Sequence, residues 1–282
     1  MGFRVTRKLG WNAIGLAVFA VMAFPVFWMI STAFKSDDQI NSFTPTWFPL
    51  HPTLAHFSNA IHQPNFGADV LNTLIVVPVA VVIAIVLAFL AAVALAKYRF
   101  KGRKLFIVAM IGVQMIPGIG LIIPLYVMLA HVPVLGIDLV GQLSGVIVVY
   151  VSAVLPFSVW TLRGFLLGIP KELEEAAMVD GSTRLGAFIR ILLPLVAPGL
   201  VATSVFAFIT SWNEYIFANL LLQRQGHQTI TVWLSYFFGS QKATDWGALM
   251  AASTLIAIPV VIFFLLVQRR IAFGLTAGAV RG

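Results

Sequence analysis

The residues best suited to bind a metal ion or move a proton are five histidines. They are His51, His56, His62, His131 and His227. No two of them have the spacing of metal ligands on one helix, and no carboxylates are arranged around them in a ligand pattern. The sequence also has no cysteine, which excludes Cys-ligated zinc, iron–sulfur clusters, disulfides and a catalytic thiol. We therefore expect neither a metal site nor a catalytic residue.

Local signatures of hydrolases and nucleotide-binding proteins are missing as well. The sequence contains no G-x-S-x-G elbow, no H-E-x-x-H helix and no G-x-x-x-x-G-K-[ST] phosphate loop. We predict that the chain is not an enzyme and binds no cofactor of its own.

One carboxylate stands out at the edge of an apolar segment. Glu214 lies in Ser211-Trp212-Asn213-Glu214-Tyr215, directly after a long apolar run. A buried carboxylate would be costly unless it faced protein or water, which makes Glu214 a candidate for a transport route. The alternative is that it lies at the depth of the lipid headgroups and only ends the helix.

The composition of the chain is strongly apolar, and this determines the environment in which these residues lie. Hydrophobic residues make up 60% of the 282 residues, charged residues 10%, and the mean hydropathy is +0.97. Soluble domains are about half apolar and about a quarter charged. The chain is therefore expected to lie in a membrane, and disordered and fibrous proteins are excluded.

Six runs without Asp, Glu, Lys or Arg are each longer than 20 residues. They are residues 11–34, 70–96, 105–130, 139–162, 191–213 and 246–268. Each can cross a hydrocarbon core of roughly 30 Å as a helix, because a helix satisfies its own backbone hydrogen bonds. We predict an all-α membrane protein with six transmembrane helices. The first run also resembles a signal peptide, but its apolar core exceeds the usual length of about 7–15 residues.

The distribution of cations predicts the orientation. If both termini are cytoplasmic, all but three of the 18 lysine and arginine residues lie in cytoplasmic segments. The exceptions are Lys35, Arg224 and Lys242. This asymmetry satisfies the positive-inside rule. Anionic lipids at the inner leaflet are sufficient partners for the net charge of +8, so we expect no nucleic-acid binding.

The two long outer loops, residues 35–69 and 214–245, are rich in aromatic residues. Trp47, Trp233 and their aromatic neighbours are typical either of an interfacial belt or of a surface that docks an external partner. Within the third run, Met115-Ile116-Pro117-Gly118-Ile119-Gly120 favours a broken helix. Broken helices often line transport routes, although proline and glycine are also common in membrane helices.

The cytoplasmic loop between the fourth and fifth spans has helical patterning. Leu173, Ala176 and Ala177 recur at helical spacing after Pro170, Gly181 interrupts the pattern, and Ser182 or Thr183 can cap a second short helix. We predict two short amphipathic helices, with Pro194 opening the fifth span. They lie either on the bilayer or in a groove of another protein.

The same loop carries a family motif. Its residues read E-A-A-x3-G-x9-I-x-L-P, from Glu175 to Pro194. This resembles the loop by which permease subunits of ATP-binding-cassette importers dock on their ATPases. The flanking segments resemble the second, six-helix permease of maltose-type carbohydrate importers. They are Met115-Ile116-Pro117, Ile123-Pro124-Leu125-Tyr126, Leu155-Pro156-Phe157, Arg163-Gly164-Phe165, Ile169-Pro170-Lys171-Glu172, Trp212-Asn213-Glu214 and residues 274–280.

The resemblance implies a partner set and a mechanism. The chain would pair with a second permease, two cytoplasmic ATPase subunits that use ATP and Mg²⁺, and an extracytoplasmic sugar-binding protein. Residues 170–194 would form the cytoplasmic coupling helix and its flanks. The residues implied in coupling are Glu175, Ala176, Ala177, Asp180, Gly181, Ile191, Leu193 and Pro194. Glu175 would bond to the ATPase and Gly181 would permit the turn.

Further roles follow from the same resemblance. Tyr126, Asn213 and Glu214 are the candidates for the substrate route. Part of the last outer loop would reach into the binding protein, with Gly239, Ser240, Gln241 and Asp245 as its candidate residues. The C-terminal tail would contact the ATPase pair. The expected division is an N-terminal region, residues 1–69, and a permease core, residues 70–282, in a bacterial or archaeal cytoplasmic membrane.

Other classes of protein remain as alternatives. A permease of the same type for a non-sugar solute would keep the coupling loop. A secondary transporter would need inverted repeats and ionisable residues inside the membrane, and an intramembrane enzyme would need a buried nucleophile or metal ligands. The sequence favours a sugar importer, and the cargo expected is a di- or oligosaccharide.

Overall fold

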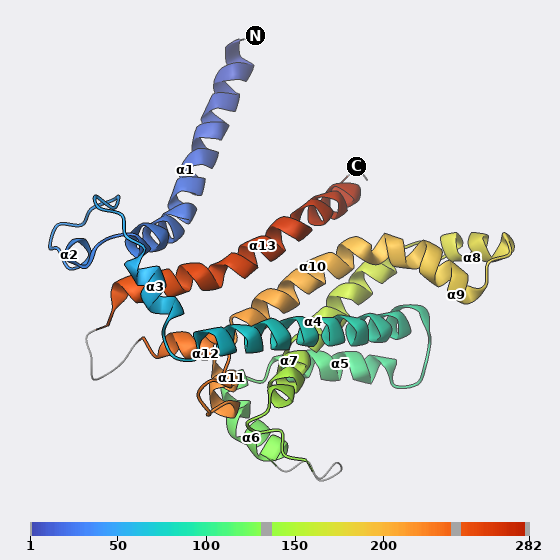
Figure 1. The fold of residues 1–282 in the computed structure, drawn as a ribbon. Helices are drawn as coiled ribbons and strands as arrows, with labels where there is room; N and C mark the ends of the chain where they lie inside the picture. The colour runs from blue at the N-terminus through green and yellow to red at the C-terminus, as the bar shows by residue number, and fades with distance from the viewer. Residues whose placement is uncertain (1, 131–136, 238–243, 280–282) are drawn as a thin grey trace. The chain divides into compact units, whose positions relative to one another are not determined.

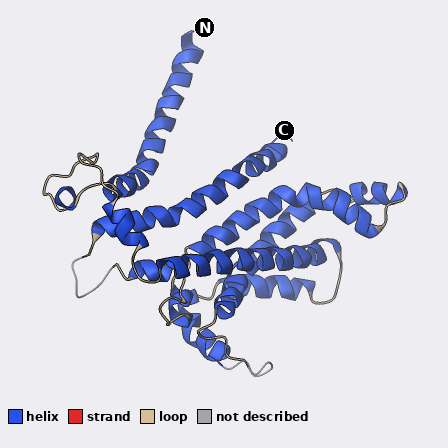
Figure 2. Ribbon diagram, in the orientation of Figure 1, coloured by secondary structure: helices blue, strands red, loops and turns tan. Residues whose placement is uncertain are grey.

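The computed structural model describes residues 2–130, 137–237 and 244–279, and these residues form helices joined by loops (Figure 1, Figure 2). In chain order the helices are α1 (Gly2–Ala33), α2 (Asp37–Ile40), α3 (Ala55–Ile61), α4 (Phe66–Lys97), α5 (Arg103–Gln114), η1 (Gly118–Leu121), α6 (Ile122–Ala130), α7 (Leu143–Leu167), α8 (Glu172–Val179), α9 (Arg184–Ala187), η2 (Phe188–Leu192), α10 (Leu193–Trp212), α11 (Ile216–Leu221), α12 (Ile230–Ser235) and α13 (Trp246–Ala279).

In the part of the chain that the structure describes, five helices are long and apolar enough to cross a membrane. They are Gly10–Ala33, Phe66–Lys97, Leu143–Leu167, Arg184–Trp212 and Trp246–Gln268. The third expected span is not a single straight helix. A bend of 97° separates the segment Arg103–Gln114 from the segment Gly118–Ala130. The break lies at Pro117, which has no N–H to donate to a helical hydrogen bond, and at Gly118, which follows it. The described residues therefore contain five helices that could span a membrane, or six if this broken pair is one span.

The chain divides into two compact units. One comprises residues 1–66 and 234–259, and the other comprises residues 67–233 and 260–282. The first boundary lies close to the expected one at residue 69, but residues 234–259 group with the N-terminal region. This grouping depends on contacts between distant parts of the sequence.

The core of the second unit is formed by α4, α7 and α10. On α4, the residues at every fourth position are small and fully buried: Val76, Ala80, Ala84, Ala88 and Ala92. Residues four apart lie on one helix face, and small side chains let neighbouring helices approach closely in a membrane. Ala88 and Ala92 accordingly pack with residues of α7 and α10 in one apolar cluster.

The packing of α7 on α10 is equally close. A Cβ added at Gly199 of α10 would lie 2.6 Å from the ring of Phe165 on α7. The side chain of Phe157 on α7 also packs against Phe206 on α10, with the rings tilted and their centroids 4.0 Å apart. Glycine is thus required at position 199 by space and not by backbone conformation.

Polar contacts fasten the start of α4 to the segment before α12. Asp69, which is fully buried, accepts a hydrogen bond at Oδ1 from the backbone N–H of Gln228 at 3.0 Å. Asn72 donates to the carbonyl of Gln228 at 3.0 Å, and Thr73 Oγ1 accepts from the N–H of Ile230 at 2.8 Å. These bonds satisfy a loop backbone that would otherwise be left unpaired at the end of the helices.

The two ends of α4 therefore identify the two ends of the second unit. The start of α4 contacts residues 226–230, whereas Lys97 at its last turn forms an ion pair with Glu174 of α8. A helix of 32 residues is about 48 Å long. The loop that precedes α12 and the α8–α9 loop consequently lie at opposite ends of a helix long enough to cross a bilayer.

In the first unit, aromatic side chains join α1 to the loop that follows α2. Trp47 packs against Phe24 and Trp28 of α1, with ring centroids 5.8 and 6.1 Å apart. The hydroxyl of Ser31 donates to the carbonyl of Trp47 at 2.7 Å. Trp47 is therefore held by contacts within its own unit although it is largely exposed.

Candidate functional site

The α8–α9 hairpin carries most of the residues of the sequence motif. Figure 1 shows α8 and α9 folded back on one another at the end of α10. Glu172, Glu174 and Glu175 lie in the first turn of α8, where negative charge stabilises the helix dipole. Glu175 and Ala176 are exposed, whereas Ala177 is buried against the rest of the hairpin.

Gly181 makes the turn between the two helices of this hairpin. Its φ is +89°, a left-handed conformation that is favourable only for glycine. The N–H of Ser182 bonds to the carbonyl of Ala177 at 2.9 Å, and that of Gly181 to the carbonyl of Met178 at 3.1 Å. This is the hydrogen-bond pattern of a glycine-terminated helix. Asp180, the residue before the turn, is exposed.

Thr183 begins the second helix of the hairpin. Its hydroxyl accepts a hydrogen bond from the N–H of Gly186 at 3.0 Å, as expected of an N-cap. The predicted interruption at Gly181 and the cap at Ser182 or Thr183 are therefore confirmed, and Thr183 is the residue that caps.

The connection to the next long helix differs from the prediction. We expected a separate short helix and a fresh start at Pro194, but α9 continues through the π-helical turn η2 into α10. In an α-helix, Pro194 would leave the carbonyl of Arg190 without a donor. A π-turn placed directly before the proline changes the local bonding pattern and lets the helix continue. Ile191 lies in this turn, half-buried, and Leu193 and Pro194 open α10.

Apolar side chains of the hairpin face outwards. Val179 is 86% exposed, Leu185 67% and Ile189 51%. Exposed aliphatic residues beside a row of carboxylates are typical of a surface that another protein or a lipid covers. The carboxylate of Glu175 lies at this same exposed surface.

The inner side of the hairpin is fixed to the helical core. Lys97 of α4 forms an ion pair with Glu174, and both side chains are mostly buried. The ring of Phe188 packs against Phe89 of α4 at 5.5 Å, and Leu192 belongs to the apolar cluster of α4, α7 and α10. The hairpin is therefore attached directly to α4 and α10 by both polar and apolar contacts.

The elements that carry or follow the route candidates are in contact in the second unit. Tyr126 is half-buried on α6, and α6 packs against α11, which follows Asn213 and Glu214 closely. Asn213 is exposed, with its amide donating to the carbonyl of Ile209 at 2.9 Å.

Glu214, the third candidate for the substrate route, has a structural role. Its two carboxylate oxygens accept hydrogen bonds from the backbone N–H groups of Phe217 and Ala218, at 2.9 and 3.0 Å. Its own carbonyl accepts from the hydroxyls of Tyr150 and Thr231. The carboxylate thus caps α11, and these contacts hold the end of α10 in place.

Of the outer-loop candidates, only one lies within the described residues. Gly239, Ser240 and Gln241 fall outside them. Asp245 caps the start of α13, where its Oδ1 accepts from the N–H of Ala248 at 2.9 Å.

The structure also brings together polar groups that the sequence pattern missed. His56 lies beside two carboxylates, those of Asp37 and Asp245, with one potential ligand atom from each residue within 4.8 Å of the others. The interpretation that no carboxylate is arranged around the histidines is therefore wrong for His56. The three residues are far apart in the sequence, so no spacing pattern could have signalled them.

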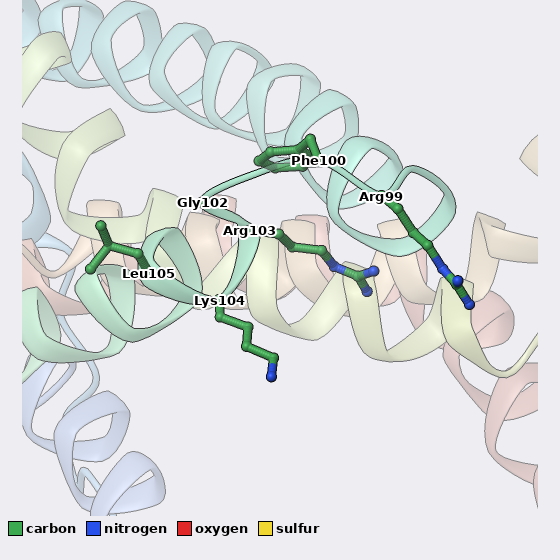
Figure 3. Close-up of a pocket in the computed structure, with 6 residues that line it drawn as sticks. All are labelled: Arg99, Phe100, Gly102, Arg103, Lys104 and Leu105. Atoms are coloured by element: carbon green, nitrogen blue, oxygen red, sulfur yellow. The ribbon is translucent and has the colours of Figure 1, made fainter.

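A shallow cationic hollow lies in the loop between α4 and α5 (Figure 3). Its lining residues are Arg99, Phe100, Gly102, Arg103, Lys104 and Leu105. Gly102 makes the turn with a φ of +91°. Because this loop follows Lys97, which contacts Glu174, the hollow lies at the same end of the second unit as the α8–α9 hairpin.

Comparisons of the sequence with known proteins identify the family of the chain. Residues 80–276 match the model of the binding-protein-dependent transport system inner membrane component. The chain is 44% identical over 274 residues to the diacetylchitobiose uptake system permease protein DasC of Streptomyces coelicolor, with 96% of each chain covered. It is 34% identical over 277 residues to the trehalose/maltose transport system permease protein MalG of Thermococcus litoralis, with 95% of each covered.

Solved structures agree on the fold. A chain of a bacterial transporter that imports the acidic polysaccharide alginate superposes with a TM-score of 0.78 at 21% identity, covering 94% of this chain and 97% of that one. The alginate transporter in complex with its alginate pentasaccharide-bound periplasmic protein gives a TM-score of 0.65 at 20% identity, covering 93% and 94%. On the family match and these relatives, the chain belongs to the family of binding-protein-dependent transport system inner membrane components.

Proposed function

We propose that the chain is a membrane-spanning permease subunit of an ATP-driven importer for a sugar. The observation that carries this proposal is the α8–α9 hairpin, an exposed helix pair with a glycine turn that is anchored to the spanning helices. Members of the family are transport components, and ATP hydrolysis belongs to separate ATPase subunits. The chain is accordingly a multi-pass membrane protein and not an enzyme.

The proposed topology has six spans with both termini in the cytoplasm. The broken pair α5 and α6 then counts as one bent span. The placement of the α4–α5 loop and the α8–α9 hairpin at one end of the second unit supports this topology, because the α4–α5 loop is rich in Lys and Arg and the hairpin with its flanks carries Lys171, Arg184 and Arg190.

The coupling step is proposed to occur at the hairpin. A groove of one ATPase subunit would receive α8 and α9, with Glu175 bonding at the groove and Val179, Leu185 and Ile189 covered by it. ATP-driven closure of the two ATPases would move the hairpin. The ion pair of Lys97 with Glu174 would pass this motion to α4. The transport route between the two permeases would then open alternately to the two sides of the membrane.

The partners proposed are a second permease, two ATPase subunits and an extracytoplasmic binding protein. The alginate importer, whose structure includes a periplasmic protein with bound pentasaccharide, supports the last of these by analogy of fold. The C-terminal tail would contact the ATPase pair. No nucleic acid is needed as a partner, because the cationic loops face the inner leaflet in this topology.

Lipid is the partner proposed for the α4–α5 hollow. Arg99 lies in the loop between α4 and α5, Arg103 and Lys104 begin α5 (Figure 3), and Phe100 of the loop is 47% exposed. Cations beside an exposed ring suit an anionic headgroup above the acyl chains.

The cargo is proposed to be a di- or oligosaccharide. Support comes from the relatives whose names specify diacetylchitobiose, and trehalose or maltose. Within the chain, Tyr126 and Asn213 are the residues best placed to meet a sugar hydroxyl, since the carboxylate of Glu214 is already engaged at the start of α11.

The experiment that tests the function is uptake of labelled sugars by cells that lack the chromosomal gene and carry it on a plasmid. Cells with the chain should accumulate at least one di- or oligosaccharide faster than cells without it. Equal uptake of every sugar, together with a difference for an amino acid or phosphate, would overturn the assignment to sugars.

A further inference from the structure

The first unit holds a cluster of metal-ligand side chains that lies outside the coupling hairpin and the candidate substrate route. Asp37 begins α2, His56 lies on α3, and Asp245 directly precedes α13. One potential ligand atom from each of the three lies within 4.8 Å of the other two. All three residues belong to the unit of residues 1–66 and 234–259.

The imidazole of His56 is buried and held in one orientation. The residue is 3% exposed, and its Nε2–H donates to the carbonyl of Lys35 at 2.9 Å. Because a carbonyl can only accept, the neutral ring carries its proton on Nε2 and its lone pair on Nδ1. A backbone carbonyl that fixes the second nitrogen is the usual arrangement around metal-binding histidines.

The other ring nitrogen has no hydrogen-bond partner among the described residues. Nδ1 of His56 is buried without a hydrogen bond. The ring lies against Gly247, where an added Cβ would be 2.2 Å from the imidazole. Glycine at position 247 therefore leaves room for the ring beside the start of α13. A buried lone pair without a donor is costly for the protein, and a cation or a proton would remove that cost.

The two carboxylates supply the charge that a cation needs. Asp37 Oδ1 lies 3.7 Å from Nε2 of His56, so this carboxylate must turn toward Nδ1 to share an ion with it, and its side chain, which is 79% exposed, has room for that movement. Asp245 uses Oδ1 to cap α13, which leaves Oδ2 available. Within residues 2–130, 137–237 and 244–279, no lysine or arginine comes within 4.0 Å of either carboxylate.

The nearest lysine in the sequence is engaged elsewhere. The ammonium of Lys35 lies 4.0 Å from the centroid of the Trp28 ring, in a cation–π contact. Lys35 contributes to the cluster through its carbonyl, by orienting His56, and not through its charge.

We propose that Asp37, His56 and Asp245 form a binding site for one divalent transition-metal ion, of which Zn²⁺ fits the ligand set best. One imidazole and two carboxylates are ligands that Zn²⁺ accepts, whereas Ca²⁺ and Mg²⁺ prefer oxygen alone. Ligand atoms around a tetrahedral zinc are about 3.4 Å apart, so the exposed carboxylates would have to move inwards by about 1 Å. Water would complete the coordination. The bound ion would join α2, α3 and the start of α13.

The test is a zinc titration of the chain, purified with its partners and without a polyhistidine tag, after metal has been removed with a chelator. A chromogenic chelator competes for the ion and reports the affinity. Wild type should bind one Zn²⁺ per chain. Asp37→Asn and Asp245→Asn should each weaken binding by tenfold or more, because each removes one anionic ligand.

Asp38→Asn is the matched control. Asp38 is the exposed neighbour of Asp37 on the same short helix and lies outside the cluster, so its loss of charge should leave the affinity unchanged. Asn can still accept the hydrogen bond of Ala248, so Asp245→Asn tests the metal without removing the cap of α13. X-ray absorption at the zinc edge should show one imidazole among the ligands.

Two results would overturn the proposal. One is the absence of saturable binding at one Zn²⁺ per chain, including the case in which the cluster responds only to protons. The other is equal affinity in wild type, Asp37→Asn, Asp245→Asn and Asp38→Asn, which would place any bound zinc elsewhere.

Discussion

Lys97 and Glu174 form an ion pair between the last turn of α4 and the first turn of α8. The pair joins a helix whose other end holds the segment before α12 to the hairpin that carries the family motif. It is the most direct polar connection between the spanning helices and the hairpin within the described part of the chain.

Reversing one charge of this pair should uncouple the hairpin from α4. We expect Lys97→Glu or Glu174→Lys alone to reduce sugar-stimulated ATP hydrolysis several-fold, because two like charges would face each other in a mostly buried position. The double variant Lys97→Glu/Glu174→Lys should recover most of the activity. Lys101→Glu, in the exposed loop beyond α4, serves as the control. A double variant no better than the singles would show that the pair does not transmit the motion.

Glu175 should act on the ATPase and not on the fold of the permease. Its side chain is exposed, so Glu175→Gln should leave the thermal midpoint unchanged. Loss of a hydrogen bond to a charged group costs about 1.5–3 kcal/mol, so association with the ATPase should weaken by about tenfold or more. Glu172→Gln, in the same helical turn, is the control for charge. Equal effects of the two variants on ATPase binding would argue against a specific contact at Glu175.

Gly181 should tolerate only residues that accept a left-handed conformation. A Cβ there meets nothing within 4 Å, so Gly181→Ala is penalised by the φ of +89° alone, at about 1–2 kcal/mol. Transport should fall with Gly181→Ala and recover in part with Gly181→Asn, since Asn adopts this conformation more readily. Gly164→Ala, which also has open space but an ordinary φ, should be neutral. Full transport by Gly181→Ala would remove the turn from the mechanism.

Glu214 distinguishes a structural role from contact with the sugar. Because its carboxylate caps α11, Glu214→Ala should destabilise the permease by about 0.5–2 kcal/mol, seen as a lower thermal midpoint in detergent. The KM for the sugar should change little. A raised KM with an unchanged midpoint would instead place the carboxylate in the substrate route.

The parts of the structure that depend on local sequence were predictable. Apolar runs identified the long helices, and the glycine at position 181 together with Thr183 identified the turn and cap of the hairpin, because the physics acts within a few residues. The weak point at Pro117 was visible too, although its bend of 97° was not.

Features that join distant residues were not predictable. The bond from Gln228 to Asp69, the pair of Lys97 with Glu174, and the neighbours of His56 all depend on how the helices pack. The π-turn before Pro194 was missed for a different reason, since a proline after a helical pattern usually indicates a new start. In this chain the helix continues past the proline because the hydrogen-bonding pattern changes locally.

The central claim, that this permease works in a sugar importer, is tested most directly by affinity purification of the chain from its native membrane in mild detergent. The copurified proteins are identified by mass spectrometry, and the ATPase activity of the eluate is measured with and without sugar. We predict recovery of a second permease, an ATPase and a solute-binding protein, with hydrolysis stimulated by a di- or oligosaccharide. A chain that elutes alone and inactive even after mild cross-linking, or a complex stimulated only by a non-sugar solute, would contradict the account.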